Sequence, residues 1–410
     1  MSKSRLLVLT PRFPYPAVGG DRVRILHICR ALSSHFDLTL LSMCESRTEL
    51  EHKPTDGLFT SVERVYLPRW RSYFNTAIAL PSKRPLQLAY YGSSEFRAKL
   101  DRLVPQHDAV LAHMIRTGQY LEGLSTVKIL EMTDAISMNY LRMREMTGNR
   151  SWRKLVYLVE EGRLKAYEQQ TVRRFDRVWL TSRRDREFLD PLNGASIDVI
   201  PNGTDLEGLA FTPPHSTANV IVFIGNMVSL QNQDACHYFI RSILPGVRER
   251  ARVRFRIVGN APDAVKKQFQ NYADVEMTGR IEQIQHGVED AFCGVCSVRA
   301  AAGIQNKILE YLALGIPCVT STQGLGGVDA KSGEELFAYS DPKEAVEQIL
   351  KLFYDTELRL RMATAGRQLV TSQYNWVKLY RAVIDSCERG NDTLARMTRE
   401  TTAVPPFCAN

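Results

Sequence analysis

The segment of residues 199–225, VIPNGTDLEGLAFTPPHSTANVIVFIG, decides how the chain is divided. Its first part is rich in turn formers and prolines, which interrupt helices and strands. The run Val220–Ile224 that follows is unbroken and apolar, as in a strand buried on both faces, and it ends in Gly225. A new series of strands and helices therefore begins here. The segment predicts a second Rossmann-like unit after a linker near residues 205–218.

Short apolar runs alternate with longer amphipathic stretches on both sides of this linker. Strands are expected at 5–10, 37–42, 109–112, 127–132, 177–181, 198–200, 220–224, 254–258, 275–278, 292–298 and 316–320. Helices are expected at 21–35, 152–175, 234–249, 307–313, 343–355 and 358–372. Such alternation predicts an α/β fold of two doubly wound, parallel-sheet domains facing a central cleft. Ligands of open α/β sheets bind at the carboxyl ends of the strands.

Composition and charge narrow the class of protein. The 410 residues are 44% hydrophobic and 24% charged, as in ordinary globular domains, which excludes a disordered chain. Residues 1–200 carry 31 Lys and Arg against 22 Asp and Glu, whereas residues 201–410 carry 22 against 23. A basic first half suits a phosphorylated substrate or an anionic membrane face, although a solvated surface without a partner remains open. Nucleic acid ranks last, because no nucleic-acid-binding motif is present.

Neither a secretory signal nor a membrane-spanning run is found in the sequence, so we expect a cytoplasmic protein. The eight cysteines are scattered, and no Asp-x-Asp metal motif occurs, so no metal site is expected. Cys293 and Cys296 have metal or redox spacing but lack a second ligand pair. They are interpreted as small apolar residues of a buried strand.

Two segments have the form of phosphate sites. In the first, a strand leads through residues 11–20 to Gly19-Gly20 and a helix that Asp21 would cap. A purely structural turn is an equal alternative there. In the second, Gly303 would open a helix that runs to residue 314. Its N-terminus beside Lys307 and Arg299 could hold a diphosphate.

Glu310 lies on the same face of that helix as Lys307 and could accept both hydroxyls of a ribose. The alternative for Lys307 and Glu310 is an ordinary surface ion pair.

The segment Arg299–Val319 resembles the donor site of family 4 (group 1) glycosyltransferases of the GT-B fold, especially those of bacterial exopolysaccharide synthesis. Four further motifs follow the family's order: residues 6–16 with Gly19-Gly20, 199–205, 223–225 and 256–259. The resemblance spans about residues 5–385. It implies an acceptor domain of residues 1–205, joined by a helix near 374–390, a donor domain of 206–373 and a tail of 391–410.

The resemblance also implies the roles of individual residues. Donor-binding residues would be Glu310, Gly303, Ile304, Gly225, Asn226, Gly259, Gly19 and Gly20. Catalytic residues would be Lys307, Arg299, Asp134 and His113; a satisfied structural histidine is the alternative for His113. Two departures stand out: Ala302 replaces the first of the family's two glutamates, and residues 226–234 lack the usual Arg and Lys. Lys307 and Arg299 are therefore expected to supply the positive charge.

The implied activity is a retaining, metal-independent transfer of a sugar from a UDP- or GDP-sugar to a lipid-linked or oligosaccharide acceptor. No tightly bound cofactor is expected. Residues 66–74, followed by Lys83 and Arg84, interleave aromatic and basic side chains as membrane-interface segments do, or form an ordinary loop. Peripheral contact with the anionic inner membrane is thus a further expectation. A non-catalytic scaffold of the same fold remains an alternative. A two-Rossmann NAD-dependent dehydrogenase is less favoured, because the dinucleotide-binding glycine motif is missing.

Overall fold

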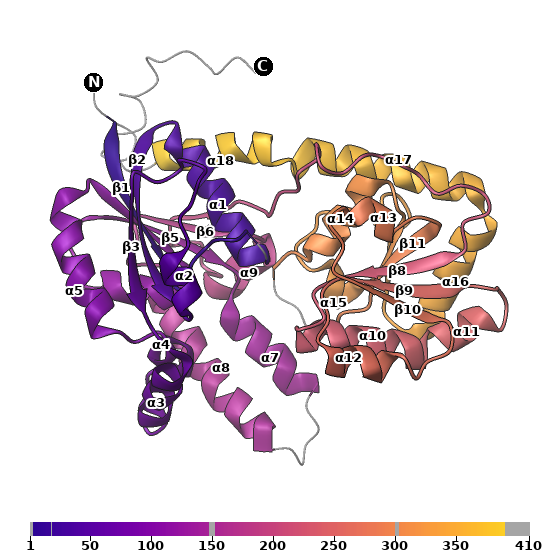
Figure 1. Cartoon of the computed structure of the whole chain (residues 1–410), viewed down its shortest axis with the longest axis horizontal. Helices are drawn as coiled ribbons and strands as arrows, with labels where there is room; N and C mark the ends of the chain where they lie inside the picture. The colour runs from indigo at the N-terminus through magenta and orange to yellow at the C-terminus, as the bar shows by residue number, and fades with distance from the viewer. Residues whose placement is uncertain (1–2, 18, 147–151, 300–302, 390–410) are drawn as a thin grey trace. The chain divides into compact units, whose positions relative to one another are not determined.

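The computed structural model describes residues 3–17, 19–146, 152–299 and 303–389, and forms two compact units (Figure 1). The first unit contains the chain up to Pro201 and again from Leu379, and the second contains Asn202–Lys378. These borders lie within five residues of those expected from the sequence. Ala302 and the expected tail of 391–410 lie outside the described residues.

The first unit is built on a seven-stranded parallel sheet of order β3-β2-β1-β4-β5-β6-β7. Its strands are β1 Ser4–Thr10, β2 Phe36–Cys44, β3 Ser61–Tyr66, β4 Ala109–His113, β5 Val127–Thr133, β6 Arg177–Leu180 and β7 Ile197–Val199. Residues Leu6–Leu9 of β1 are fully buried, because the central strand is covered on both faces. The order β3-β2-β1-β4-β5-β6 is that of a Rossmann sheet.

Helices of the first unit connect these strands and cover the sheet. They are α1 Gly20–Ser33, α2 Arg47–Glu51, α3 Arg69–Ala79, α4 Leu86–Tyr90, α5 Ser94–Leu103, α6 Met114–Gly118, α7 Ile136–Met146, α8 Trp152–Thr171 and α9 Arg183–Leu189. Two short 3-10 helices follow α5 and α6, at Val104–Gln106 and Gln119–Leu121. The last helix of the described chain, α18 Trp376–Glu388, returns to this unit, where Ser386 accepts a hydrogen bond from the indole of buried Trp179 (2.8 Å) (Figure 1).

The second unit repeats the arrangement with a six-stranded parallel sheet of order β10-β9-β8-β11-β12-β13. Its strands are β8 Val220–Ile224, β9 Arg254–Val258, β10 Val275–Gly279, β11 Ala291–Cys296, β12 Cys318–Ser321 and β13 Phe337–Tyr339. Its helices are α10 Leu230–Ser242, α11 Leu244–Arg248, α12 Asp263–Phe269, α13 Ile284–Gly287, α14 Asn306–Leu314, α15 Thr322–Leu325, α16 Pro342–Tyr354 and α17 Thr356–Gln373. Two doubly wound parallel domains are therefore confirmed, each with its own apolar core.

The differences from the sequence expectation have physical reasons. Strands β3 and β13 were not expected. Strand β3 (SVERVY) is partly exposed and interrupts its apolar residues with Glu63 and Arg64, and β13 is only three residues long, so neither forms a long apolar run. The helix expected at 234–249 begins earlier, at Leu230, and divides after Ser242, because Pro245 starts a new helix, α11. Cys293 and Cys296 are buried in β11, which confirms their interpretation as apolar strand residues.

Candidate functional site

Each sheet has one switch point, where the chain stops adding strands on one side of the first strand and continues on its other side. In the first sheet it lies between β1 and β4, and in the second between β8 and β11. The carboxyl ends of strands at such a point form the usual ligand-binding crevice of a Rossmann sheet. The residues singled out in the sequence follow these four strands and their neighbours, so the candidate site has one part in each unit.

Two glycines bring β8 and β9 close together at their carboxyl ends. Gly225 follows β8, and its amide donates a hydrogen bond to the carbonyl of Val258 (2.9 Å). Gly259 follows β9 with φ of 145°, and a Cβ there would lie 2.1 Å from the carbonyl oxygen of Gly225. Only glycine fits at this position. The structure thus gives Gly259 a packing role, and its expected contact with the donor remains a prediction.

Lys307 lies in the first turn of α14 and is only 9% exposed. Its Nζ donates a hydrogen bond to Oδ1 of Asn232 (3.1 Å) and lies 5.1 Å from the ring centre of Phe223. Among the residues that the structure describes, no carboxylate forms an ion pair with it. The first amides of a helix lack intrahelical acceptors, so the positive end of α14 adds to the charge of Lys307. The combination suits a phosphate.

Glu310 follows Lys307 by one turn of α14 and is partly buried. Within the described parts of the chain, its carboxylate has neither a hydrogen-bond donor nor an ion-pair partner, so the expected alternative of an ion pair with Lys307 is not formed. Burial raises the pKa of Glu310, and the positive charge of Lys307 acts in the opposite direction. A partly exposed carboxylate without a protein donor is open to donors from a ligand or from water.

Arg299 has a partner that the sequence analysis did not foresee. Its Nε donates to Oδ2 of Asp234 (3.1 Å), its Nη2 bonds the other carboxylate oxygen, and the guanidinium lies over the ring of Tyr238. The hydrogen bond that Arg299 donates to Asp234 is the main reason that the pKa of Arg299 is raised. To bind a diphosphate, Arg299 has to exchange this carboxylate for it. Lys307 is therefore the better candidate for the phosphate-binding charge.

The start of α14 differs from the expected one. The helix begins at Asn306, three residues after Gly303, with Gln305 as its N-cap. Gly303 has φ of 64°, in the left-handed region that favours glycine, and its carbonyl accepts a hydrogen bond from the amide of Gly327 (3.1 Å). Gly303 and the buried Ile304 thus form the turn that leads into the helix. The sequence spacing marked the loop but placed the helix one turn too early.

Tyr311 holds α14 against the sheet, a role that the sequence did not reveal. Its hydroxyl accepts a hydrogen bond from the amide of Ile224 (2.8 Å) and lies 3.2 Å from the carbonyl oxygen of Val295. A Cβ on Gly294 would lie 2.6 Å from the Tyr311 ring, so glycine makes room for it. Tyr311 thus joins α14 to the strands β8 and β11. Residues 226–234, which lack the family's usual Arg and Lys, supply the polar partners of Lys307 and Arg299. Those partners are Asn232 and Asp234.

In the first unit, a buried charge network lies at the ends of β4 and β5. His113 ends β4, is 3% exposed, and its Nδ1 is hydrogen-bonded to Oε2 of Glu131. Arg24 of α1 donates from Nε to the other oxygen of Glu131 (2.6 Å), and the Thr133 hydroxyl bonds both oxygens (3.1 Å each). Burial alone would raise the pKa of Glu131, but the charges and hydrogen bonds of Arg24 and His113 lower it to about 2. The network supports the structural alternative for His113.

Asp134 lies next to this network and is more accessible than His113. It accepts a hydrogen bond from the Thr181 hydroxyl (3.0 Å). Burial and the charge of buried Asp185 raise its pKa well above the usual range. The neighbouring Glu168 is fully buried, and burial raises its pKa to about 7. A carboxylate with a raised pKa can take up a proton near neutral pH.

The Gly19-Gly20 loop begins α1 in a different way from that expected. The helix starts at Gly20 with Gly19 (φ 107°) as its N-cap, so Asp21 lies in the first turn and does not cap the helix. Asp21 instead forms a 3.7 Å ion pair with Arg12, which donates from Nε to the Tyr91 hydroxyl (3.2 Å). The side chain of Asp21 is therefore turned to the preceding loop. Contact of the two glycines with a ligand remains a prediction.

No cluster of three or more His, Cys, Asp or Glu side chains that could hold a metal ion was found in residues 3–17, 19–146, 152–299 and 303–389. Likewise, each helix within these ranges is too short or too polar to cross a membrane.

Comparison with known proteins identifies the second unit. Residues 218–355 match the family model of group 1 glycosyl transferases. A GDP-mannose-dependent alpha-(1-6)-phosphatidylinositol monomannoside mannosyltransferase of Mycobacterium tuberculosis is 25% identical over 227 residues, which are 48% of this chain and 57% of that protein. The match therefore spans little more than half the length of this relative. The resemblance to group 1 glycosyltransferases is confirmed.

Solved structures show the fold of the whole chain. Sucrose-phosphate synthase of Thermosynechococcus elongatus has a TM-score of 0.69 at 12% identity, with 97% of this chain and 99% of that chain covered. Anabaena HepE (Alr3699) in complex with UDP has a TM-score of 0.64 at 14% identity, with coverage of 93% and 99%. The chain has the two-domain GT-B fold of these glycosyltransferases.

Proposed function

We propose that this chain, whose residues 218–355 match the group 1 glycosyl transferases, transfers a sugar from a nucleoside-diphosphate sugar to an acceptor hydroxyl. The second unit binds the donor and the first unit binds the acceptor. The observation that carries the proposal is the pair on α14. Lys307 offers a buried positive charge at the helix start, and Glu310 offers a carboxylate without a described donor one turn later.

This pair matches the two ends of a nucleoside diphosphate. The diphosphate lies at the start of α14 against Lys307, where the helix dipole favours negative charge. The ribose lies further along the helix, and its two hydroxyls donate to Glu310. UDP is bound by one of the structural neighbours, and the mycobacterial relative is named as GDP-mannose-dependent. The donor is therefore a UDP- or GDP-sugar, and no tightly bound cofactor is required.

The transfer replaces one bond at the anomeric carbon of the sugar by another. The bond from this carbon to the diphosphate oxygen breaks, and a bond to the acceptor oxygen forms on the same face, with retention of configuration. Lys307 and the start of α14 stabilise the charge that develops on the leaving diphosphate, the contribution that usually dominates such catalysis. Asp134 takes the proton of the acceptor hydroxyl, since its raised pKa suits that exchange. The reaction needs no divalent metal.

The acceptor is a lipid-linked saccharide or an oligosaccharide of bacterial surface or exopolysaccharide synthesis. The motifs of residues 299–319 resemble enzymes of that class, and the basic first half suits an acceptor that carries phosphate. The protein then works in the cytoplasm, at the inner face of the membrane.

Titration calorimetry with UDP, GDP and NAD tests the proposed donor. We expect one of the two nucleoside diphosphates to bind and NAD not to bind. Glu310→Ala should weaken that binding by about 1.5–3 kcal/mol, the usual worth of hydrogen bonds to a charged group. The exposed Glu357, on α17 of the same unit, provides the control variant Glu357→Ala, which should bind as the wild type does. Equal affinity of the folded Glu310→Ala variant would refute the ribose assignment.

A radiolabelled-donor assay tests the chemistry itself. Transfer to an added saccharide-lipid acceptor should persist after exhaustive chelation. Loss of transfer on chelation would contradict the metal-independent reaction, and binding of the nucleotide without transfer or hydrolysis would favour a non-catalytic scaffold.

A further inference from the structure

Helix α3 exposes the face that a helix of a globular protein usually buries. Only Ser72 and Ala79 of this helix are buried. Its aromatic and aliphatic side chains face solvent: Trp70 is 70% exposed, and Tyr73, Phe74 and Ile78 are also more than half exposed. Because residues 70, 74 and 78 recur at intervals of four, they form one stripe along the helix. Residues 66–74 are therefore not a simple loop, and the stripe has no partner within the described chain.

The chain around this stripe is positively charged. From Arg64 to Ser94 the sequence contains five Lys and Arg and no Asp or Glu. Arg69 forms an ion pair with Glu45 (3.0 Å), whereas Lys83 and Arg84, which lie shortly after the end of the helix at Ala79, are exposed. Within the residues described, neither of them forms an ion pair with a carboxylate. An apolar stripe is thus flanked by unneutralised positive charge.

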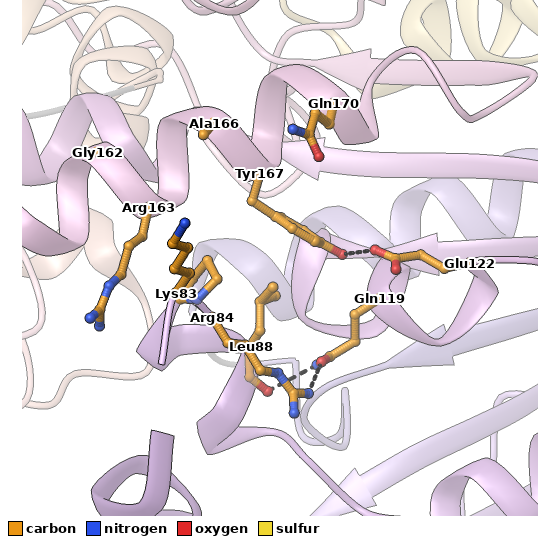
Figure 2. A pocket seen from close by; sticks show the side chains of 11 residues that line it. Lys83, Arg84, Leu88, Gln119, Glu122, Gly162, Arg163, Ala166, Tyr167 and Gln170 are labelled. Carbon is orange, nitrogen blue, oxygen red and sulfur yellow. Dashed lines mark hydrogen bonds between the residues drawn. The ribbon is translucent and has the colours of Figure 1, made fainter. Parts of the chain in front are cut away.

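A cavity of about 690 Å³ lies next to the end of α3, and basic side chains line it (Figure 2). Lys83 and Arg84 line one side of it, and Arg163 of α8 lies near Lys83 in the view. Arg163 donates to the carbonyl of Leu80 (3.1 Å), which ties α8 to the end of α3. The one acidic side chain of the lining, Glu122, already accepts a hydrogen bond from Tyr167 (2.8 Å). The cavity is therefore suited to a phosphate group.

Helix α8 also exposes apolar side chains. Leu158 and Val159, one turn before Arg163, are both nearly half exposed. Helices α3 and α8 lie close together in the first unit, as Figure 1 shows and as the bond between Arg163 and Leu80 requires. Both helices expose apolar side chains, and the basic cavity lies between α8 and residues 83–88, which follow α3 in the chain.

We propose that this surface of α3, α8 and the basic cavity docks the protein on an anionic phospholipid bilayer. Trp70, Phe74 and Ile78 enter the interface between headgroups and acyl chains, and the cavity takes the phosphate of an anionic headgroup. Aromatic side chains flanked by Lys and Arg are typical of helices that lie in this interface. A second copy of the chain fits less well, because a symmetric contact would bring the same positive charges against each other.

The position of α3 gives the docking a function. The helix leaves the sheet after β3, at the carboxyl ends of the parallel strands, and Asp134 follows β5 at the same edge. A bilayer bound by α3 therefore lies on the side of the first unit where the proposed acceptor groups are. This consequence rests on the proposed function, whereas the docking itself does not.

Sedimentation with vesicles tests the docking on the full chain. The wild-type protein should bind vesicles of phosphatidylglycerol and phosphatidylcholine in low salt, bind pure phosphatidylcholine at least about tenfold less, and be released as salt rises. Trp70→Ser/Phe74→Ser and Lys83→Glu/Arg84→Glu should each weaken binding at least about tenfold. The changed side chains are exposed, and circular dichroism checks that the variants are folded.

Matched control variants distinguish the role of this surface from the general effects of removing an exposed apolar side chain or of changing the net charge. Leu192→Ser removes an 83% exposed apolar side chain elsewhere in the first unit. Lys266→Glu/Lys267→Glu, on α12, changes the net charge by the same amount as the cavity variant. Both should bind vesicles like the wild type, and a weakening equal to that of the α3 and cavity variants would overturn the proposal.

Lipids brominated in the acyl chains give an independent readout: they should quench the tryptophan fluorescence of the wild type, and quench that of Trp70→Phe much less, because Trp70 is the tryptophan that enters the bilayer. If the wild type does not bind the vesicles, the docking is refuted. It is also refuted if Trp70→Ser/Phe74→Ser still binds vesicles but no longer forms a dimer that the wild type forms, because the stripe would then contact a second copy of the chain. Because vesicle binding needs no nucleotide, it can succeed or fail independently of donor binding.

Discussion

Replacing Glu131 by Gln is the sharpest test of the buried charge network in the first unit. Glu131 is fully buried and Arg24 is 1% exposed, and 2.6 Å separates their bonded atoms. The variant leaves the guanidinium of Arg24 without its carboxylate in the interior. Breaking a buried ion pair on one side usually costs about 3–5 kcal/mol, since the remaining charge stays desolvated. We expect a loss of unfolding free energy of this size.

The pKa of Glu131 gives a second measure of the same interaction. Folding lowers this pKa from 4.5 to about 2. At about 1.4 kcal/mol per pH unit, this corresponds to about 3 kcal/mol of stability. Because the folded pKa is the lower one, this stability is fully present above about pH 4.5 and is lost as the pH falls towards 2. The two magnitudes agree.

Urea denaturation of the wild type and variant, at pH 7 and at lower pH, measures both effects. The difference between the two proteins should be about 3 kcal/mol or more at pH 7 and should shrink below pH 4.5. Glu187→Gln, at an exposed position of α9, should leave the stability within about 0.5 kcal/mol of the wild type. A cost below 1 kcal/mol for Glu131→Gln, or one independent of pH, would refute the ion-pair argument.

Three further changes test the rest of the site. Lys307→Ala should lower turnover about 100-fold or more, because a preorganised positive charge at the leaving group is lost, and wild-type turnover in an initial-rate assay would contradict this role. Asp134→Asn should lower kcat and remove the fall of activity on the acid side of the pH profile, because a base with a raised pKa becomes protonated, and so inactive, as the pH falls. An unchanged pH profile would exclude Asp134 as the base. Gly259→Ala should destabilise the second unit by at least about 1–3 kcal/mol in thermal unfolding, because its Cβ would lie 2.1 Å from the Gly225 carbonyl, whereas Gly194→Ala, with nothing within 4 Å, should have a small effect.

The sequence was a good guide to the central parts of both sheets. Strands such as β1 and β8 are buried on both faces, so an unbroken apolar run is their direct signature. The edge strands β3 and β13 have no such signature, because one side of an edge strand carries no neighbour. Helix α3 was not expected either: residues 66–74 were interpreted as an interface segment or a loop, and the apolar side chains of the helix are exposed while Ser72 and Ala79 are buried.

The candidate site was predictable where function depends on one segment. Lys307 and Glu310 share a helix, so their spacing in the sequence places them on one face. The contacts of Arg299 with Asp234 and of Tyr311 with the amide of residue 224 join positions that are 65 and 87 residues apart. Residue spacing holds no information on such pairs, and only the packing of α10 and α14 on the sheet brings them together.

The charges of the two units support the proposed division between donor and acceptor. In the second unit, the first turn of α14 carries the cation Lys307, and no described carboxylate forms an ion pair with it. In the first unit, Glu131 of β5, Asp134 of the following loop and Asp185 of α9 lie near one another, and Glu131 is bonded by both Arg24 and His113. A diphosphate placed among these carboxylates would be repelled, whereas a hydroxyl could donate a proton to them. These charges support our proposal that the nucleotide binds to the second unit and that the hydroxyl that loses a proton binds to the first.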